Sequence, residues 1–376
     1  MRNLFFVFSG IVLILLTIFS GCDPGKQTNE KKISEKRTLQ LNYAQQFAIE
    51  YTDTTKQVTI LQPWSGSDKR FTYYLSGNKF SKNCIPLPVD SVVCFSPTHL
   101  AMLNLLGVGD KIIAIPSRDD VYNIGIYDKN KILKKREMGS AVAQNLELLI
   151  HLAPDLVFES ATGSAFDKFE KLEEVGLKTA LFSAHTEPHP LGRAEWIKYM
   201  AVFFDLENKA DSIFQSIEQR YNDIKKKVRT PKNRPIVFVG YPWKDAWVIP
   251  GGNSYMARFI EDAGGSYIYK KDTASGNLHI SLEEVSEKMS QCDIWLNPGT
   301  AVVRIEEIEN GMIGKQLIGN MKIYNNNKRL NGSGKNDFWE SGIVNPDIIL
   351  KDLVKIFHPE VFPGDDLYYF RNLRSH

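Results

Sequence analysis

Apolar β-branched runs alternate along most of the chain with segments whose apolar residues recur at helical spacing. The stretch "VVCFSPTHLAMLNLLGVGDKIIAI" at 92–115 shows one such unit, with a leucine-rich segment between two short strands. Ser96 and Pro97 mark a helix start, because a polar N-cap followed by proline at the first helical position suits that end. Repetition of strand and helix in this order predicts a parallel α/β sheet.

Two series of this kind are separated by a long helical segment. "NLELLIHLAPDLVFES" continues the first series, whereas "IVFVGY" opens the second, which ends in the helical "NPDIILKDLVKIFHPEVF". Residues 193–228 contain no glycine or proline and predict a connector that breaks into two helices near Asp205 and Leu206. The expected fold class is therefore α/β, with two Rossmann-like lobes of mostly parallel sheets joined by a long rigid helix.

The N-terminus carries a targeting signal. The apolar run from Leu4 to Phe19 is short for a membrane span, which needs roughly 20 residues, and fits the core of a secretory signal. Ser20 and Gly21 before Cys22 resemble the lipobox of bacterial lipoproteins, so we expect signal removal and acylation of Cys22. A plain cleaved signal and a short anchor are the alternatives.

The predicted organisation follows from these patterns. A polar stretch after Cys22 indicates a flexible tether. The alternation of apolar and polar residues on both sides of "TDTTK" indicates a hairpin. The expected parts are a signal peptide at 1–21, a lipidated flexible tether at 22–37, an N-terminal β-hairpin addition at 38–80, an N-lobe at 81–192, a connecting helix at 193–233 and a C-lobe at 234–376.

Composition argues against several classes of function. The net charge of +2, without a basic stripe, argues against a nucleic-acid partner. No G-x-S-x-G, H-E-x-x-H or G-x-x-x-x-G-K-[ST] motif occurs, so we expect no enzyme. Cys84, Cys94 and Cys292 lack metal-type spacing. A disulfide between Cys84 and Cys94 and separate buried thiols are both open.

The sequence resembles a known family, the periplasmic substrate-binding proteins of ABC importers for iron–siderophores, haem and vitamin B12. The resemblance rests on "SPTHLAMLNLLGVGDKIIAI", "NLELLIHLAPDLVFES", "GGNSYMARFIEDAGGSYIY", "HISLEEVSEKMSQCDIWL" and the terminal helix, and spans about residues 90–362. It implies a non-enzymatic protein that captures a ferric siderophore between two lobes and delivers it to a membrane permease. Vitamin B12 (cobalamin) and haem are the alternative ligands.

The resemblance also implies partners and a location. We expect an ABC permease with its ATPase, a small-molecule metal chelate as ligand, and contact with the membrane through the N-terminal lipid. The chain is expected to be a monomer without a cofactor, anchored at the periplasmic face of a bacterial membrane. In this family a glutamate on each lobe meets arginines of the permease, and Glu147 in "QNLEL" and Glu283 in "SLEEV" match these positions.

Binding proteins of two α/β lobes hold their ligand between the lobes, at the loops that follow the strands. Those loops offer hydroxyls, aromatic rings and one guanidinium, a combination that suits a bulky anionic iron chelate. The candidate ligand-binding residues are Thr98, Arg118, Thr162, His185, Tyr241, Trp243, Phe338 and Trp339.

The histidines raise two further possibilities, a bare-metal site and a haem site. "HTEPH" places His185 near His189, but Pro188 and Pro190 make this stretch a loop, which argues against a bare-metal site built on helical spacing. Haem capture uses a histidine or tyrosine as axial ligand, and His185 or Tyr241 could serve. The sequence predicts no direct metal site.

Overall fold

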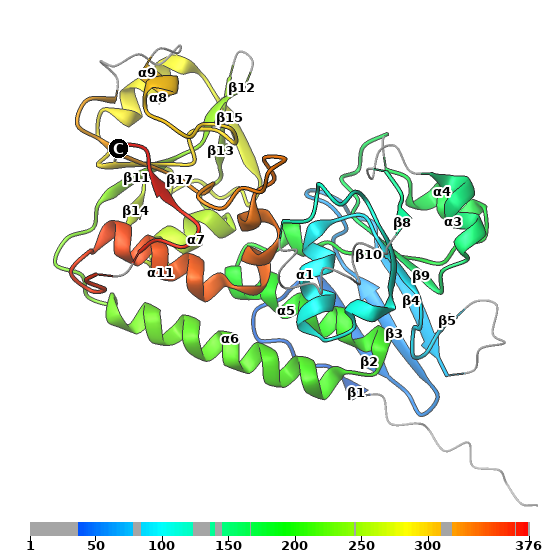
Figure 1. The fold of residues 1–376 in the computed structure, drawn as a ribbon. Helices are drawn as coiled ribbons and strands as arrows, with labels where there is room; N and C mark the ends of the chain where they lie inside the picture. The colour runs from blue at the N-terminus through cyan, green and yellow to red at the C-terminus, as the bar shows by residue number, and fades with distance from the viewer. Residues whose placement is uncertain are drawn as a thin grey trace, which may run out of the picture. The chain divides into compact units, whose positions relative to one another are not determined.

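The computed structural model describes residues 37–77, 84–122, 136–139, 145–165, 167–243, 246–309, 318–364 and 366–374 (Figure 1). These residues belong to one compact unit. The predicted signal peptide, Cys22 and nearly all of the tether lie outside the described residues. No helix among the described residues is long and apolar enough to cross a membrane.

The described N-terminal residues form a five-stranded sheet. Strand β2 pairs antiparallel with β3, and β4 extends this hairpin to a third antiparallel strand that the sequence analysis did not predict. Alternate side chains of β2, such as Phe47 and Ile49, are buried, as expected for a sheet with one covered face. The strands are β1 (Arg37–Thr38), β2 (Phe47–Tyr51), β3 (Thr55–Ile60), β4 (Phe71–Ser76) and β5 (Ile85–Pro86).

The first α/β series forms a parallel sheet with the order β10-β9-β6-β7-β8. Cys94 on β6 is a buried, reduced cysteine, so the structure contains no Cys84–Cys94 disulfide. The strands are β6 (Val92–Cys94), β7 (Ile112–Ile115), β8 (Arg136–Glu137), β9 (Leu156–Glu159) and β10 (Thr179–Leu181), and the helices are α1 (Pro97–Leu105), α3 (Leu146–Leu152) and α4 (Phe169–Glu174).

The second series forms another sheet, in which four strands are parallel and the last, β18, is antiparallel. The predicted α/β fold class with mostly parallel sheets is thus confirmed. This sheet contains β14 (Ser266–Tyr267), β11 (Ile236–Val239), β16 (Ile294–Leu296), β17 (Lys322–Asn325) and β18 (Arg371–Asn372). Its helices are α7 (Tyr255–Asp262), α8 (Leu282–Met289), α9 (Glu306–Glu309) and α11 (Pro346–Phe357).

A small antiparallel sheet joins the second series and was not predicted. It consists of β12 (Tyr241–Trp243), β13 (Ala246–Pro250) and β15 (Asn277–Ile280). Gly240 precedes β12 with φ of 126°, and a side chain there would lie 2.4 Å from the carbonyl oxygen of Val248. Only glycine fits this turn, which directs the chain after β11 into an extended strand.

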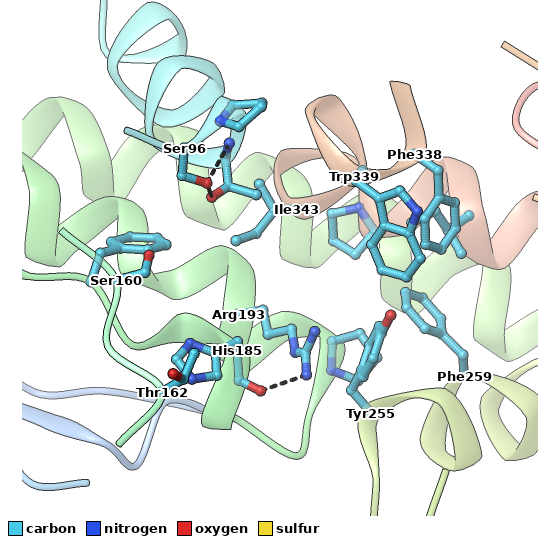
Figure 2. Close-up of a pocket in the computed structure, with 17 residues that line it drawn as sticks. Ser96, Ser160, Thr162, His185, Arg193, Tyr255, Phe259, Phe338, Trp339 and Ile343 are labelled. Carbon is cyan, nitrogen blue, oxygen red and sulfur yellow. Dashed lines mark hydrogen bonds between the residues drawn. The ribbon is translucent and has the colours of Figure 1, made fainter. Parts of the chain in front are cut away.

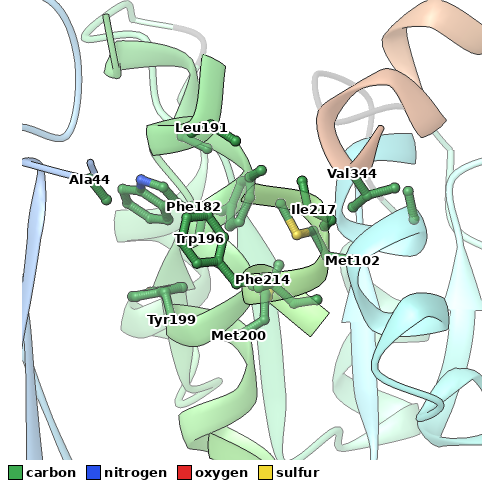
Figure 3. Close-up of a cluster of buried hydrophobic side chains, with 14 of the residues drawn as sticks. Ala44, Met102, Phe182, Leu191, Trp196, Tyr199, Met200, Phe214, Ile217 and Val344 are labelled. Carbon is green, nitrogen blue, oxygen red and sulfur yellow. The ribbon is translucent and has the colours of Figure 1, made fainter. Parts of the chain in front are cut away.

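The connector consists of two helices, as the sequence predicts. Helix α5 (Pro190–Ala201) begins slightly before the predicted start, and α6 (Glu207–Lys227) follows a break at Asp205, whose φ of 55° is left-handed. Helix α5 is buried on nearly all sides. Trp196 at its centre packs against Phe182, with ring centroids 5.1 Å apart (Figure 3). It also packs against Phe47 of the N-terminal sheet, with ring centroids 4.9 Å apart.

Candidate ligand-binding pocket

A cavity of about 460 Å³ lies at the carboxyl ends of β6, β9 and β10, where these strands face α5, α7 and the start of α11. This volume falls within the range of roughly 300–1,000 Å³ that is usual for small-molecule sites. The described lining residues are Ser96, Pro97, Thr98, Ser160, Thr162, Phe182, His185, Pro190, Arg193, Tyr255, Phe259, Phe338, Trp339, Gly342, Ile343, Pro346 and Ile349 (Figure 2).

Hydroxyl groups line one side of the pocket, because the loops after β6 and β9 are short and polar. Ser96 is the N-cap of α1, and its Oγ accepts a hydrogen bond from the backbone N–H of Thr98. The hydroxyl of Thr162 donates to a carboxylate oxygen of Asp167 at 3.0 Å, so its hydrogen is used within its own loop. Ser160 follows β9 directly and is exposed in the pocket.

Arg193 supplies the positive charge of the pocket. Its Nη2 donates to the carbonyl oxygen of His185 at 2.7 Å, and its Nε donates to the carbonyl oxygen of Glu187 at 3.2 Å. The guanidinium carbon lies 3.4 Å from the centre of the Tyr255 ring, in a cation–π arrangement (Figure 2). Burial lowers the pKa of Arg193, but arginine starts so high that the side chain stays charged at neutral pH.

His185 is uncharged in this setting. Its side chain is accessible from the pocket, yet the surrounding protein desolvates the ring and, together with the charge of Arg193, lowers its pKa to about 4. None of the described lining residues is an aspartate or a glutamate. Arg193 is therefore the one charged side chain among them, and the pocket is electrostatically suited to an anion.

Aromatic rings from the second lobe form the opposite wall. Tyr255 and Phe259 lie on α7, while Phe338 and Trp339 lie on the short helix η4 (Asp337–Trp339). Phe338 is buried and holds Trp339 in an edge-to-face contact, with ring centroids 4.9 Å apart. Trp339 itself is 49% exposed, an unusual state for a tryptophan, and presents a flat apolar face to the pocket.

The structure brings five of the eight predicted ligand-binding residues into this pocket. They are Thr98, Thr162, His185, Phe338 and Trp339. The pocket also contains residues that the sequence analysis did not select, namely Arg193, Tyr255, Phe259 and Phe182. Tyr255 lies in the "GGNSYMARF" motif, one residue after the N-cap Ser254, so a motif-based choice could have found it.

Arg118 and Tyr241 do not line this pocket, and the guanidinium that does so is Arg193. The side chain of Trp243 lies outside the described part of the chain. The Nε of Arg118 lies 3.2 Å from a carboxylate oxygen of Glu137, outside the pocket. Tyr241 and Trp243 belong to β12, whose pairing with β13 carries that segment into the antiparallel sheet.

The segment around Arg118 contacts the second lobe. The carboxylate of Glu340 accepts a hydrogen bond from the backbone N–H of Tyr122 at 2.6 Å, and Lys335 forms an ion pair with Asp120 at 2.6 Å. Asn331 donates to the carbonyl oxygen of Asp119 at 2.8 Å. These contacts connect the loop after β7 to the residues on both sides of η4, beside the aromatic wall.

The two predicted docking glutamates occupy equivalent places in the two lobes. Glu147 lies in the first turn of α3 and Glu283 in the first turn of α8, and both are exposed. Glu284 instead lies beside Tyr269, where its charge adds to burial in raising the pKa of the tyrosine. Glu284 is also exposed, so the two neighbouring glutamates of α8 differ in the proximity of Glu284 to Tyr269 and not in their access to solvent.

A pocket between two α/β lobes that share a helical connector is an arrangement suited to a protein that binds a small molecule. A model of the periplasmic binding protein family matches residues 92–326, which is more than half of the chain. The chain therefore belongs to the periplasmic binding protein family, and the resemblance drawn from its motifs is confirmed. Proteins of this class work with a membrane permease and an ATPase.

The chain is also similar to individual known proteins. An uncharacterized lipoprotein of Methanocaldococcus jannaschii is 25% identical over 404 aligned positions, which cover 96% of this chain and 94% of the relative. A ferric hydroxamate transport protein of Saccharomonospora viridis has a TM-score of 0.52 at 18% identity, covering 81% of this chain and 99% of that one. The vitamin B12 binding protein of Vibrio cholerae has a TM-score of 0.52 at 14% identity, covering 74% and 99%. The two structures share the fold of this chain.

Among the described residues, no group of three or more histidines, cysteines, aspartates or glutamates is arranged to hold a metal ion. Within the pocket, the potential metal ligands are the neutral His185 and the phenol of Tyr255. This set is small for a bare divalent cation, which takes at least four ligands in a closed protein site.

Proposed function

We propose that the pocket captures an anionic ferric siderophore and that the protein delivers it to an ABC permease. The observation that carries this proposal is the charge of Arg193, which no carboxylate among the described lining residues offsets. Catecholate and carboxylate oxygens accept charge-assisted hydrogen bonds from a guanidinium. The faces of Trp339 and Tyr255 would cover the apolar parts of the chelate.

A titration panel tests this choice of ligand. Quenching of intrinsic tryptophan fluorescence is followed with ferric enterobactin, ferric citrate, neutral ferrichrome, cyanocobalamin and haemin. We expect the anionic iron chelates to bind most tightly, because their acceptor oxygens and their negative charge are arranged directly around the iron. Tight binding of cyanocobalamin, together with indifference to the charge of Arg193, would replace the proposal with a cobalamin-binding function.

Haem is a second candidate, because two potential axial ligands line the pocket. Burial raises the pKa of the Tyr255 phenol, and the charge of the Arg193 guanidinium over its ring offsets part of that rise. His185 is neutral and therefore able to coordinate iron. Haemin that binds with an absorption spectrum abolished by Tyr255→Phe would favour this candidate over the siderophore.

We further propose that Cys22 is acylated and anchors the protein outside the cytoplasm. The support is the segment from Ser20 to Cys22 after an apolar run, and the name of the Methanocaldococcus relative as a lipoprotein. Cys22→Ala is expected to yield a protein without lipid, since the thiol is the acceptor. Metabolic labelling with a palmitate analogue measures this in cells, and label that persists on the variant would contradict the anchor.

Glu147 and Glu283 are proposed to orient the protein on its permease. Two exposed carboxylates at the starts of α3 and α8 lie on different lobes, so together they define an orientation for a partner that presents arginines. Charge reversal to lysine at either position is expected to impair uptake of iron chelate by cells. Ligand affinity in solution should stay unchanged, and Glu284→Lys serves as the matched control. A parallel loss of affinity would show that the two glutamates act on the pocket or on the fold.

A further inference from the structure

A buried histidine stands directly behind the hydroxyl-lined side of the pocket. His99 lies in the first turn of α1, is fully buried, and packs edge-to-face against Phe182, with ring centroids 4.9 Å apart. Its Nε2 lies 3.3 Å from the Oγ of Ser160, which is exposed in the pocket. Its Nδ1 is buried without a hydrogen-bond partner among the described residues.

The ring of His99 is neutral throughout the physiological range. Burial lowers its pKa to about 3, and the nearby His185 contributes to this effect. A neutral imidazole carries one hydrogen, on either Nε2 or Nδ1, and the nitrogen without the hydrogen can only accept. The hydrogen bond between His99 and Ser160 therefore has two possible directions, and the tautomer of His99 decides which one forms.

The surroundings of Nδ1 favour the tautomer with the hydrogen on Nε2. Buried N–H donors without a partner are rare in proteins, whereas acceptors with an unused lone pair are less uncommon. A hydrogen on Nδ1 of His99 would be such an orphaned donor. A hydrogen on Nε2 instead has the Oγ of Ser160 as its acceptor.

We propose that His99 acts as a positioning residue that holds the hydroxyl of Ser160 as a hydrogen-bond donor facing the pocket. When Nε2–H donates to the Oγ of Ser160, the hydroxyl hydrogen cannot return to the histidine. His99 is the one side-chain partner of that oxygen among the described residues, so the hydrogen is available to a ligand.

The proposed role of His99 and Ser160 refines the proposed function, and it rests on that function for the ligand, an anionic iron chelate. Ser160, after β9, and Arg193, on α5, both line the pocket, so a ligand meets two donors from different elements. Thr162 does not add a third, because its hydroxyl already donates to Asp167. A chelate with two acceptor oxygens, such as a catecholate or a carboxylate, satisfies this pattern, whereas a ligand that presents an N–H or O–H opposite Ser160 does not.

The tautomer of His99 can be measured on the protein without ligand. In protein labelled with ¹⁵N-histidine, two-bond ¹H–¹⁵N correlations distinguish a protonated ring nitrogen from an unprotonated one by chemical shift. The signals of His99 are identified by their loss in His99→Phe. We expect protonated Nε2 and unprotonated Nδ1 at pH 7. The opposite assignment would overturn the proposal, whatever the ligand proves to be.

Ligand binding provides the second test, with ferric enterobactin as the probe. Ser160→Ala is expected to weaken binding about five- to tenfold, because one hydrogen bond to the chelate is lost. Ser216→Ala, which removes a hydroxyl from the exposed face of α6 outside the pocket, is the matched control, and we expect its affinity to stay within twofold of wild type. An unchanged affinity of Ser160→Ala would overturn the proposal.

A double-mutant cycle separates positioning from a general structural effect. His99→Phe keeps an aromatic ring in the same packing but cannot hold the hydroxyl, so it should weaken binding in the wild-type background and have no further effect in Ser160→Ala. Equal losses in both backgrounds would show that His99 acts on the fold alone. Failure of wild type to bind any anionic iron chelate of the titration panel would overturn the proposed function, while the tautomer measurement still decides the role of His99.

Discussion

Replacement of Arg193 with alanine is expected to weaken the binding of ferric enterobactin ten- to a hundredfold. A hydrogen bond to a charged group contributes about 1.5–3 kcal/mol, and each 1.4 kcal/mol corresponds to a factor of ten in affinity. No other group can take over the charge, since His185 is neutral and the described lining residues include no second cation. Fluorescence titration of the purified variant measures the change.

Two matched variants make this result specific. Arg118→Ala removes a guanidinium that pairs with Glu137 outside the pocket, so its affinity should equal that of wild type. Arg193→Lys keeps the positive charge but loses the planar set of N–H donors of the guanidinium, so an intermediate affinity is expected. Because Arg193 also donates to the carbonyl oxygens of His185 and Glu187, thermal unfolding of each variant must be recorded beside the titration. A loss in Arg118→Ala without one in Arg193→Ala would mean that the ligand binds elsewhere.

The charge of the pocket also sets the pH dependence of binding. The pKa of His185 is lowered to about 4, so this ring stays neutral from pH 6 to pH 8 and the affinity for a ligand of constant charge should be flat there. Below about pH 4 the ring gains a proton and a positive charge, which would strengthen the binding of an anion. A steep change in affinity near pH 6.5 would instead indicate a histidine with an ordinary pKa.

The sequence allowed the architecture to be predicted where local signals coincide with the fold. Ser96 before Pro97 does begin a helix, because the serine Oγ accepts the N–H of Thr98. The connector breaks at Asp205, where the chain adopts a left-handed conformation. Thr98, Thr162 and His185 were found because the carboxyl ends of parallel strands meet at one edge of a sheet, so residues after successive strands come together.

The rule that ligands meet the carboxyl ends of strands does not locate every residue of the pocket. Tyr241 follows a strand of the second sheet, but Gly240 turns the chain into a further strand instead of a loop. Arg193 lies on α5, a helix that is buried on nearly all sides, so the sequence offers no polar stripe to show which side chains face the pocket. Its position depends on the N-terminal sheet and on α7, which are distant in the sequence.

The largest loss of stability is expected at Glu195, on the same helix. Glu195 is fully buried, and its carboxylate accepts hydrogen bonds from the backbone N–H groups of Asn42, Tyr43 and Ala44 at 2.8–3.1 Å. It also forms an ion pair with Lys198 at 3.0 Å. Glu195→Ala would leave the lysine and three amides without this partner. Breaking a buried pair costs about 3–5 kcal/mol of unfolding free energy, which we expect urea denaturation to show.

A less buried glutamate that contacts the same segment supplies the control. Glu218 on α6 accepts a hydrogen bond from the hydroxyl of Tyr43 at 2.8 Å, and its replacement with alanine should cost only about 1 kcal/mol. Hydrogen exchange of the backbone amides then shows which part of the fold is destabilised. If the N-terminal sheet opens before the rest of the fold, the amides of residues 42–44 in Glu195→Ala should exchange faster than in wild type. The amides of the sheet formed by β14, β11, β16, β17 and β18 should then exchange at the wild-type rate.

The consequence for binding follows from the position of α5 between the N-terminal sheet and the pocket. Gly192 of α5 lies so close to the connection between β1 and β2 of that sheet that a side chain there would be 3.1 Å from the carbonyl oxygen of Tyr43, and Arg193 is the next residue. A sheet released by Glu195→Ala would therefore leave α5 less firmly held, and the affinity for ferric enterobactin should fall although Glu195 does not line the pocket. A variant that loses stability by several kcal/mol but binds as wild type would show that the N-terminal sheet stabilises the fold without positioning Arg193.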